Sequence, residues 1–186
     1  MLYTKTSLQA TLVNLQTNCG NRSFQDSVWC EIRLRGTDKL LVGCIYRSPN
    51  SSAENNALLA EHLSLASNRG NSHVIVMGDF NHPEIDWTKI QTTVGINHPA
   101  TIFLESIRDA FLHQHVSEPT HHRATQTANI LDLIFSNEPD MIENLQNLVP
   151  IGKSHHSVLS FNILCYVEKK LQDERFINMI KEITRK

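Results

Sequence analysis

The chain contains 186 residues, 40% of them hydrophobic, which favours one domain with a sizeable core and excludes a globally disordered chain. Its 17 Lys and Arg residues nearly balance its 19 Asp and Glu residues, so the formal net charge of -2 excludes a strongly basic nucleic-acid coat but not a local basic groove. No apolar run approaches the roughly 20 residues that cross a bilayer, and the polar opening segment does not resemble a secretory signal. We therefore expect an intracellular protein that does not contact a membrane.

The first predicted elements form a β-hairpin. Residues 27–34 (SVWCEIRL) alternate apolar and polar side chains, which is typical of a half-buried strand. Leu40–Tyr46 is a continuous apolar run (LLVGCIY), which indicates a central strand buried on both faces. Because Gly36-Thr37-Asp38 lies between the two runs, we expect an antiparallel pair joined by a turn.

Helical and strand patterns are mixed in the rest of the chain. Apolar residues recur at helical spacing over 54–67 and 99–111, and strand-like apolar runs cover 73–77, 130–135 and 158–164. Central strands combined with amphipathic helices predict stacked sheets flanked by helices, within a domain of residues 1–165. Residues 167–185 are charged and amphipathic, so we expect 166–186 to form a helical tail or a linker.

Side chains that can carry chemistry gather at the ends of the predicted strands. A rigid sheet that presents carboxylates, an amide, a phenol and an imidazole at its strand ends can bring them around one site. Carboxylate oxygens suit a hard cation such as Mg²⁺, which would neutralise phosphoryl charge, while a carboxylate or imidazole takes the proton of a water molecule. The pattern therefore predicts metal-assisted hydrolysis of a phosphate ester. The residues concerned are Tyr46, Asp79, Asn81, Asp132 and the pair His155-His156.

Four segments resemble motifs of a known family. VIVMGDFN at Val74–Asn81 resembles the GDxN motif of the endonuclease/exonuclease/phosphatase superfamily, and KSHHSVLSF at Lys153–Phe161 resembles its SDH motif. VGCIYRSPN at Val42–Asn50 and ILDLIFSN at Ile130–Asn137 resemble segments of the endonuclease domain of non-LTR (LINE-type) retrotransposons. The order of the motifs matches over about Leu2–Leu164, and four ordered motifs are more specific than any one alone. The resemblance implies an α/β (α+β) fold of the DNase I type, a two-layer β-sandwich flanked by helices.

The resemblance also implies a role for each site residue. Asp79 would orient or deprotonate the attacking water, Asn81 would hydrogen-bond the scissile phosphate, and Tyr46 would place its phenol near that phosphate. Asp132 would pair with His156, whose charged imidazole would contact the phosphate. The implied cofactor is Mg²⁺ or Mn²⁺, held weakly by Asp79 and Asn81. The implied substrate is DNA, which would place an active protein in the nucleus, with a reverse-transcriptase module in the parent element as a partner.

Two departures from the family pattern predict impaired metal binding. The triplet Ser154-His155-His156 replaces SDH, and the imidazole of His155 is a poor ligand for Mg²⁺ and supplies no negative charge. The early Asn of the family and the Glu that is its principal metal ligand have no counterpart, because Glu31 lies too late in the order to match. We therefore expect a domain that is truncated at its N-terminus.

Other interpretations of the same residues stay open. The chain is either an endonuclease of impaired activity or a catalytically inactive remnant that serves as an interaction module or weak DNA-binding module. Phosphatases acting on inositol phosphates or sphingomyelin belong to the same superfamily, but the YRSP and LDLIF segments favour the retroelement branch. Locally, Asp79 and Asn81 could cap a turn, Tyr46 could pack under an exposed Arg47, and residues 121–123 could form a solvated loop.

Overall fold

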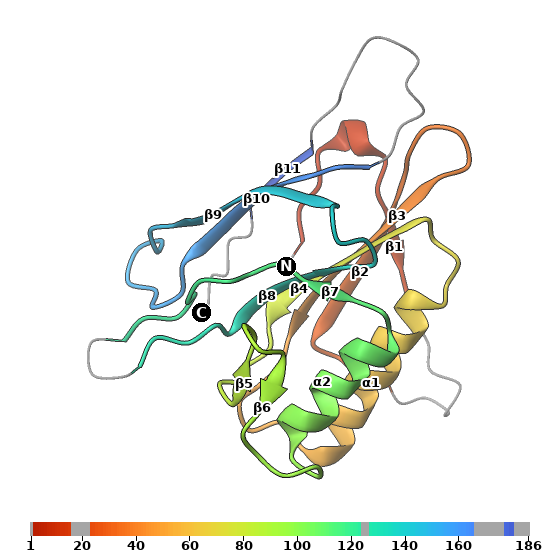
Figure 1. The fold of residues 1–186 in the computed structure, drawn as a ribbon. Coiled ribbons are helices and arrows are strands. Elements are labelled where there is room, and N and C mark those ends of the chain that lie inside the picture. Colours follow the sequence, from red (N-terminus) through yellow and green to blue (C-terminus); the bar gives the residue numbers. More distant parts are fainter. Residues whose placement is uncertain (1, 16–22, 124–126, 166–176, 181–186) are drawn as a thin grey trace.

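The computed structural model describes residues 2–15, 23–123, 127–165 and 177–180. A main sheet lies in the middle of the molecule, a small sheet lies across one of its faces, and helices α1 (Ala53–Ser67) and α2 (Pro99–Asp109) cover the other face (Figure 1). This arrangement confirms the predicted sandwich flanked by helices. None of the helices in the described ranges is long and apolar enough to span a membrane.

The main sheet is built around two central strands. Its members among the described residues are β1 (Thr11–Val13), β2 (Ser27–Arg33), β3 (Lys39–Tyr46), β4 (His73–Asp79), β7 (His113–Gln114) and β8 (Asp132–Ser136). Their order across the sheet is β1-β2-β3-β4-β8-β7. Strands β2 and β3 pair antiparallel, which confirms the hairpin, and β3 runs parallel to β4 because α1 connects them. Strand β8 pairs antiparallel with β4, so three predicted strands lie side by side.

The small sheet differs most from the sequence prediction. It comprises β9 (Ile142–Leu148), β10 (Val158–Ile163) and, within the described residues, β11 (Ile177–Ile180). For residues 166–186 we expected a helical tail or a linker, and the helical alternative is wrong at β11, because the β11 backbone pairs antiparallel with β10 and satisfies the edge of that strand. The other residues of the predicted tail lie outside the described ranges, and the domain boundary after residue 165 stays a prediction.

Local signals determine where the helices begin and end. Helix α1 begins after Ser52, whose hydroxyl oxygen accepts a hydrogen bond from the backbone N–H of Asn55 at 3.1 Å. Helix α2 has Pro99 in its first turn and ends at Asp109, short of the predicted Phe111, because Phe111 has a φ of 52° and cannot continue the helix. The remaining described elements are a 3₁₀ helix (Thr6–Leu8) and the hairpin of β5 (Ile85–Asp86) and β6 (Gln91–Thr92).

Apolar side chains of the main sheet alternate between two cores. The helix-side core packs the sheet against α1 and α2, and it includes Leu41, Ile45, Leu63, Val76, Phe103, Leu133 and Phe135. The inter-sheet core packs the main sheet against the small sheet, and it includes Val42, Ile75, Met77, Ile134, Leu159 and Phe161. The position of a residue within its strand therefore decides which core its side chain enters.

Candidate functional site

Three strands of the main sheet end in polar residues that lie in one row. Tyr46 of β3 pairs with Asp79 of β4, and Asp79 pairs in turn with Asp132 of β8. Side chains of paired positions point to the same face of a sheet. Two positions further into their strands, Met77 and Ile134 belong to the inter-sheet core. The polar row therefore continues that core at one end of the sandwich.

Glycine permits the close approach of the strands at this point. Gly78 lies directly before Asp79, and a Cβ atom built on it would collide with the carbonyl group of Ile45. The absence of a side chain lets β3 and β4 stay paired up to their last residues.

His156 reaches the row from the other layer of the sandwich. It lies two residues before β10, and its Nδ1 is 2.8 Å from Oδ2 of Asp132. The Asp132 side chain is 1% exposed and the His156 side chain is 15% exposed, so this contact is largely shielded from water. Because an ionised carboxylate only accepts hydrogen bonds, the proton of this contact lies on Nδ1 of His156.

Asp79, Asp132 and His156 form a candidate cation site. One ligand atom from each residue lies within 4.8 Å of the others. Two buried carboxylates this close repel each other unless positive charge compensates them. The two carboxylates supply oxygen ligands that suit a divalent cation such as Mg²⁺ or Mn²⁺, and the imidazole lies beside them. Among the described residues, no Glu joins this group.

A buried arginine fixes the turn that follows β4. Arg47 is 3% exposed, and its Nη1 donates to the backbone oxygens of Phe80 at 3.4 Å and of Asn81 at 3.1 Å. In return, Asn81 Nδ2 donates to the backbone oxygen of Arg47 at 2.8 Å. Asn81 has a φ of 49°, a left-handed conformation that Asn tolerates and that these bonds hold in place. The alternative of an exposed Arg47 over Tyr46 is therefore wrong.

The Arg47 guanidinium also places a positive charge near Asp79. Burial lowers the pKa of Arg47, while the nearby carboxylates of Glu84 and Asp79 oppose that shift. Its Nε donates to Oδ1 of Asn56 in α1 at 2.8 Å, which satisfies a further buried donor. Arg47 stays charged, because its ordinary pKa lies far above neutrality. It therefore adds positive charge behind Asp79.

The loop before β8 forms the opposite wall of the site. Thr120 is fully buried, and its Oγ1 accepts hydrogen bonds from the backbone N–H groups of Leu131 at 3.1 Å and Asp132 at 2.9 Å. The Thr120 carbonyl accepts from Ser157 N at 2.8 Å, which ties this loop to the segment that carries His156. Thr120 thus positions both members of the Asp132–His156 pair, and no motif in the sequence pointed to it.

A cluster of imidazoles surrounds His156. The His121 ring centroid lies 4.8 Å from that of His156 and 6.2 Å from that of His155. The pKa of His121 is lowered by burial and then by the charges of these two neighbours, so the cluster resists full protonation. His155 and His122 are exposed, whereas His121 is only partly exposed. The solvated-loop interpretation is therefore wrong for His121, which lies against the site.

His82 follows Asn81 in the chain and packs on the helix side of the main sheet. Its ring stacks on Phe103 of α2 with centroids 4.8 Å apart. Burial, with the charge of Arg47 as the next cause, lowers the pKa of His82 to about 3. The ring is therefore neutral near pH 7 and acts as a packing surface beside Asn81.

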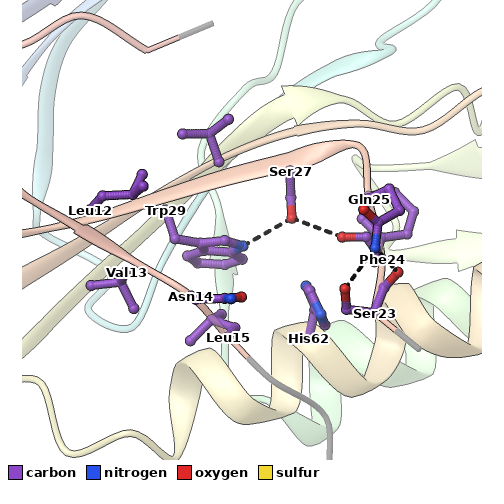
Figure 2. A pocket seen from close by; sticks show the side chains of 11 residues that line it. Leu12, Val13, Asn14, Leu15, Ser23, Phe24, Gln25, Ser27, Trp29 and His62 are labelled. Carbon is purple, nitrogen blue, oxygen red and sulfur yellow. Dashed lines mark hydrogen bonds between the residues drawn. The ribbon is translucent and has the colours of Figure 1, made fainter. Parts of the chain in front are cut away.

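A separate cavity lies on the helix side of the main sheet (Figure 2). Its volume is about 310 Å³, and its walls include Leu15, Phe24, Trp29 and His62. His62 is 2% exposed, its ring nitrogens have no hydrogen-bond partner among the described residues, and burial lowers its pKa. Trp29 and the other apolar walls belong to the helix-side core, so this cavity opens away from the polar row.

Comparison with known proteins adds a family and a fold. A family model described as endonuclease–reverse transcriptase matches residues 40–160. The solved endonuclease domain of TRAS1, a telomere-specific non-LTR retrotransposon, is similar with a TM-score of 0.58 and 20% identity over 74% of this chain and 61% of that chain. A Neisseria 3′ phosphatase bound to a product DNA hairpin has a TM-score of 0.48 and 12% identity over 69% of this chain and 62% of that chain. No curated protein sequence matches.

The similarity is partial in length. The chain spans about three fifths of each of these two structures, 61% and 62%. At such low identity, the similarity to TRAS1 supports the DNase I-like fold. The matched residues 40–160 contain Tyr46, Asp79, Asn81, Asp132 and His156.

Proposed function

The chain belongs to the endonuclease–reverse transcriptase family, and from this premise we propose that it is a metal-dependent endonuclease that hydrolyses phosphodiester bonds of DNA. The observation that carries the proposal is the meeting of Asp79, Asp132 and His156 within 4.8 Å at the end of the sandwich. The family match supports nuclease-type hydrolysis. We further propose DNA as the substrate and a role for each site residue.

Asp79 is the proposed acceptor of the water proton. Its carboxylate is buried at the end of β4 and faces the charge of Arg47, which stabilises the ionised form that a base requires. The water oxygen attacks phosphorus and its proton passes to Asp79, while one ester P–O bond breaks and the leaving sugar oxygen takes up a proton from solvent water to become a hydroxyl group. A divalent cation bound by Asp79 and Asp132, with Asn81 beside them, would neutralise phosphoryl charge during this step.

His156 and Asn81 are the proposed phosphate contacts. Asp132 holds the His156 ring through Nδ1, so Nε2 can donate to a phosphoryl oxygen when the ring is protonated. Asn81 uses one N–H of its amide for the Arg47 carbonyl, and the second N–H of the same group can serve a phosphate oxygen. Tyr46 lies next to Asp79 in the row, where its phenol can donate to the same phosphate.

We propose that the site binds its metal ion weakly. His155 stands where the family has an acid, and its side chain is exposed and neutral or positive, so it adds no anionic ligand. We expect lower activity with Mg²⁺ than with Mn²⁺, because a transition-metal ion binds a small set of anionic ligands more tightly. Binding of Mn²⁺ itself can be followed by electron paramagnetic resonance, which reports the ion without requiring turnover.

Nicking of supercoiled plasmid tests the proposal. Asp79→Asn and His156→Ala should each reduce nicking by about 100-fold or more. Asp109→Asn and His113→Ala are matched controls. They should retain activity, because Asp109 at the end of α2 and His113 in β7 are exposed. Undiminished nicking by the Asp79 and His156 variants would contradict the proposed roles.

The alternative is an inactive module that binds DNA or a protein. It is favoured by the exposed His155 in place of an acid and by the lack of a Glu in the described cation group. DNA binding without nicking in either Mg²⁺ or Mn²⁺ would favour this alternative. An active enzyme would act in the nucleus, with a reverse-transcriptase module of the parent element as its partner.

A further inference from the structure

An exposed apolar segment covers the last residue of β9 and the start of the loop that leads to β10, close to the candidate site. We name it the apolar tip, and it comprises Leu148, Val149, Pro150 and Ile151. The exposed fractions are 41% for Leu148, 84% for Val149 and 46% for Ile151. The hairpin of β9 and β10 reaches past the main sheet at this end of the molecule (Figure 1). Consecutive apolar side chains in water are typical of a contact surface.

Both ends of the apolar tip are attached to the elements that build the site. On one side, Asn147 Nδ2 donates to the backbone oxygen of Pro119 at 2.7 Å, next to the buried Thr120. On the other side, Ser154 N donates to the Ile151 oxygen at 3.2 Å, and His156 N donates to Ser154 Oγ at 3.0 Å. The tip is therefore held at a fixed place beside His156.

The chemistry of the neighbouring residues indicates a nucleic-acid occupant. Residues 148–156 (LVPIGKSHH) contain no acid, and they contain Lys153, which is exposed. A cation and two imidazoles attract phosphate, whereas the side chains of Val149 and Ile151 offer no hydrogen bond to it. Next to a phosphate-binding site, apolar side chains can pack on the sugars and bases of the same strand.

We propose that the apolar tip packs against unstacked bases of the DNA strand whose phosphate lies at Asp79 and His156, while Lys153 contacts the adjoining phosphate. This inference rests on the proposed nuclease function. It assigns the tip a role in selecting DNA with an unpaired or easily unstacked step, because unstacking a paired step costs free energy that a mismatch or bulge does not require.

Equilibrium binding to fluorescent DNA tests the inference with the whole chain, in EDTA so that no cleavage occurs. The double variant Val149→Ser/Ile151→Ser should bind bulged DNA about tenfold more weakly, with an unchanged salt dependence. Lys153→Ser should instead reduce the salt slope by about one. A 2-aminopurine base at the bulge should show altered fluorescence with the wild-type protein and less change with the double variant.

The matched control is Ile96→Ser/Phe111→Ser. These side chains are 81% and 82% exposed and flank α2 on the helix side of the main sheet, so their loss should leave binding unchanged. The inference fails if the Val149 and Ile151 variant binds like wild type, or if it mainly changes self-association in gel filtration. Plasmid nicking that depends on Asp79 would still support the nuclease in that case, whereas a wild-type chain that neither binds nor nicks DNA would overturn both proposals.

Discussion

The candidate site has a sheet side and a loop side, which are fixed in different ways. On the sheet side, Tyr46, Asp79 and Asp132 occupy paired positions on β3, β4 and β8, so ladder hydrogen bonds set their spacing. On the loop side, His156 and Thr120 are held by a few bonds between irregular segments, such as Asp132 N to Thr120 Oγ1 at 2.9 Å and Ser157 N to the Thr120 carbonyl oxygen at 2.8 Å. A ladder distributes the positioning over many bonds, whereas a loop relies on a few.

This difference teaches that the two sides should respond differently to substitution. A substitution on the sheet side removes a functional group, while the paired strands that carried it stay in place. A change on the loop side moves a catalytic group without removing it. The predictions below separate the two cases by measuring activity and stability on the same variants.

The largest expected effect follows from Asp132→Asn on the sheet side. The amide can donate to His156 Nδ1 and favour the wrong tautomer, so we expect nicking to fall by about 100- to 10,000-fold. The same change removes one of two neighbouring buried carboxylates, so thermal stability without metal should stay equal or rise. Plasmid nicking and a melting temperature in EDTA measure the two outcomes, and a large loss of stability would show that the pair is structural.

Arg47→Met tests whether the sheet side needs its buried clamp. The substitution removes the donors for Asn56, Phe80 and Asn81, so we expect the free energy of unfolding to fall by about 3 kcal/mol. The control is Arg108→Met, because the Arg108 side chain is 48% exposed and its ion pair with Glu105 contributes at most about 1 kcal/mol. Urea unfolding compares the two variants, and equal losses would mean that the Arg47 clamp is dispensable.

Most of the main sheet could be predicted from the sequence because its strands carry strong local patterns. Continuous apolar runs in β3 and β4 reflect burial on both faces, and the polar residues at their ends, predicted as site residues, lie side by side in the sheet. Strand β9 could not be predicted, because IENLQNL lies at an edge and exposes half of its residues. The spacing of apolar residues predicted a helical tail or a linker. Such spacing does not show whether another strand, such as β10, pairs with the segment.

The parts of the site that escaped prediction are those made by distant contacts. Arg47 looked like a surface cation, because nothing near it in the sequence reveals backbone acceptors more than thirty positions away, at Phe80 and Asn81. Thr120 and His121 lie in a polar stretch that resembles a solvated loop. Bonds to the start of β8 accompany the burial of Thr120, and a bridge to His156 leaves His121 only partly exposed.

Thr120→Val tests the loop side directly. Valine keeps the shape of threonine but removes the acceptor for the N–H groups of Leu131 and Asp132, so we expect a loss of about 2 kcal/mol in unfolding free energy. Displacement of the Asp132–His156 pair should also lower kcat more than it raises KM. The exposed Thr93→Val is the control, and a Thr120 variant with normal kcat would show that the loop does not position the pair.

The smallest expected effect concerns the pH dependence of stability, and it compares one histidine from each side. His82, on the sheet side, has its pKa lowered by burial to about 3, whereas His121, on the loop side, is lowered from the same ordinary value but is more exposed. Below about pH 6.5 the unfolded chain binds a proton at each ring, and the folded chain does not bind one at His82 until about pH 3. Stability should therefore fall as the pH falls from 6.5 towards 3.

Replacing the titrating ring should remove its share of that slope. We expect His82→Gln to flatten the dependence between pH 4.5 and 6 by about one proton, or about 1.4 kcal/mol per pH unit. His121→Gln should flatten it less, because a partly exposed ring gains its proton sooner in the folded chain. Urea unfolding at several pH values measures the slopes. If His121→Gln flattened the slope more than His82→Gln, the imidazole on the loop side would be the one more strongly shielded from water, which would contradict this prediction.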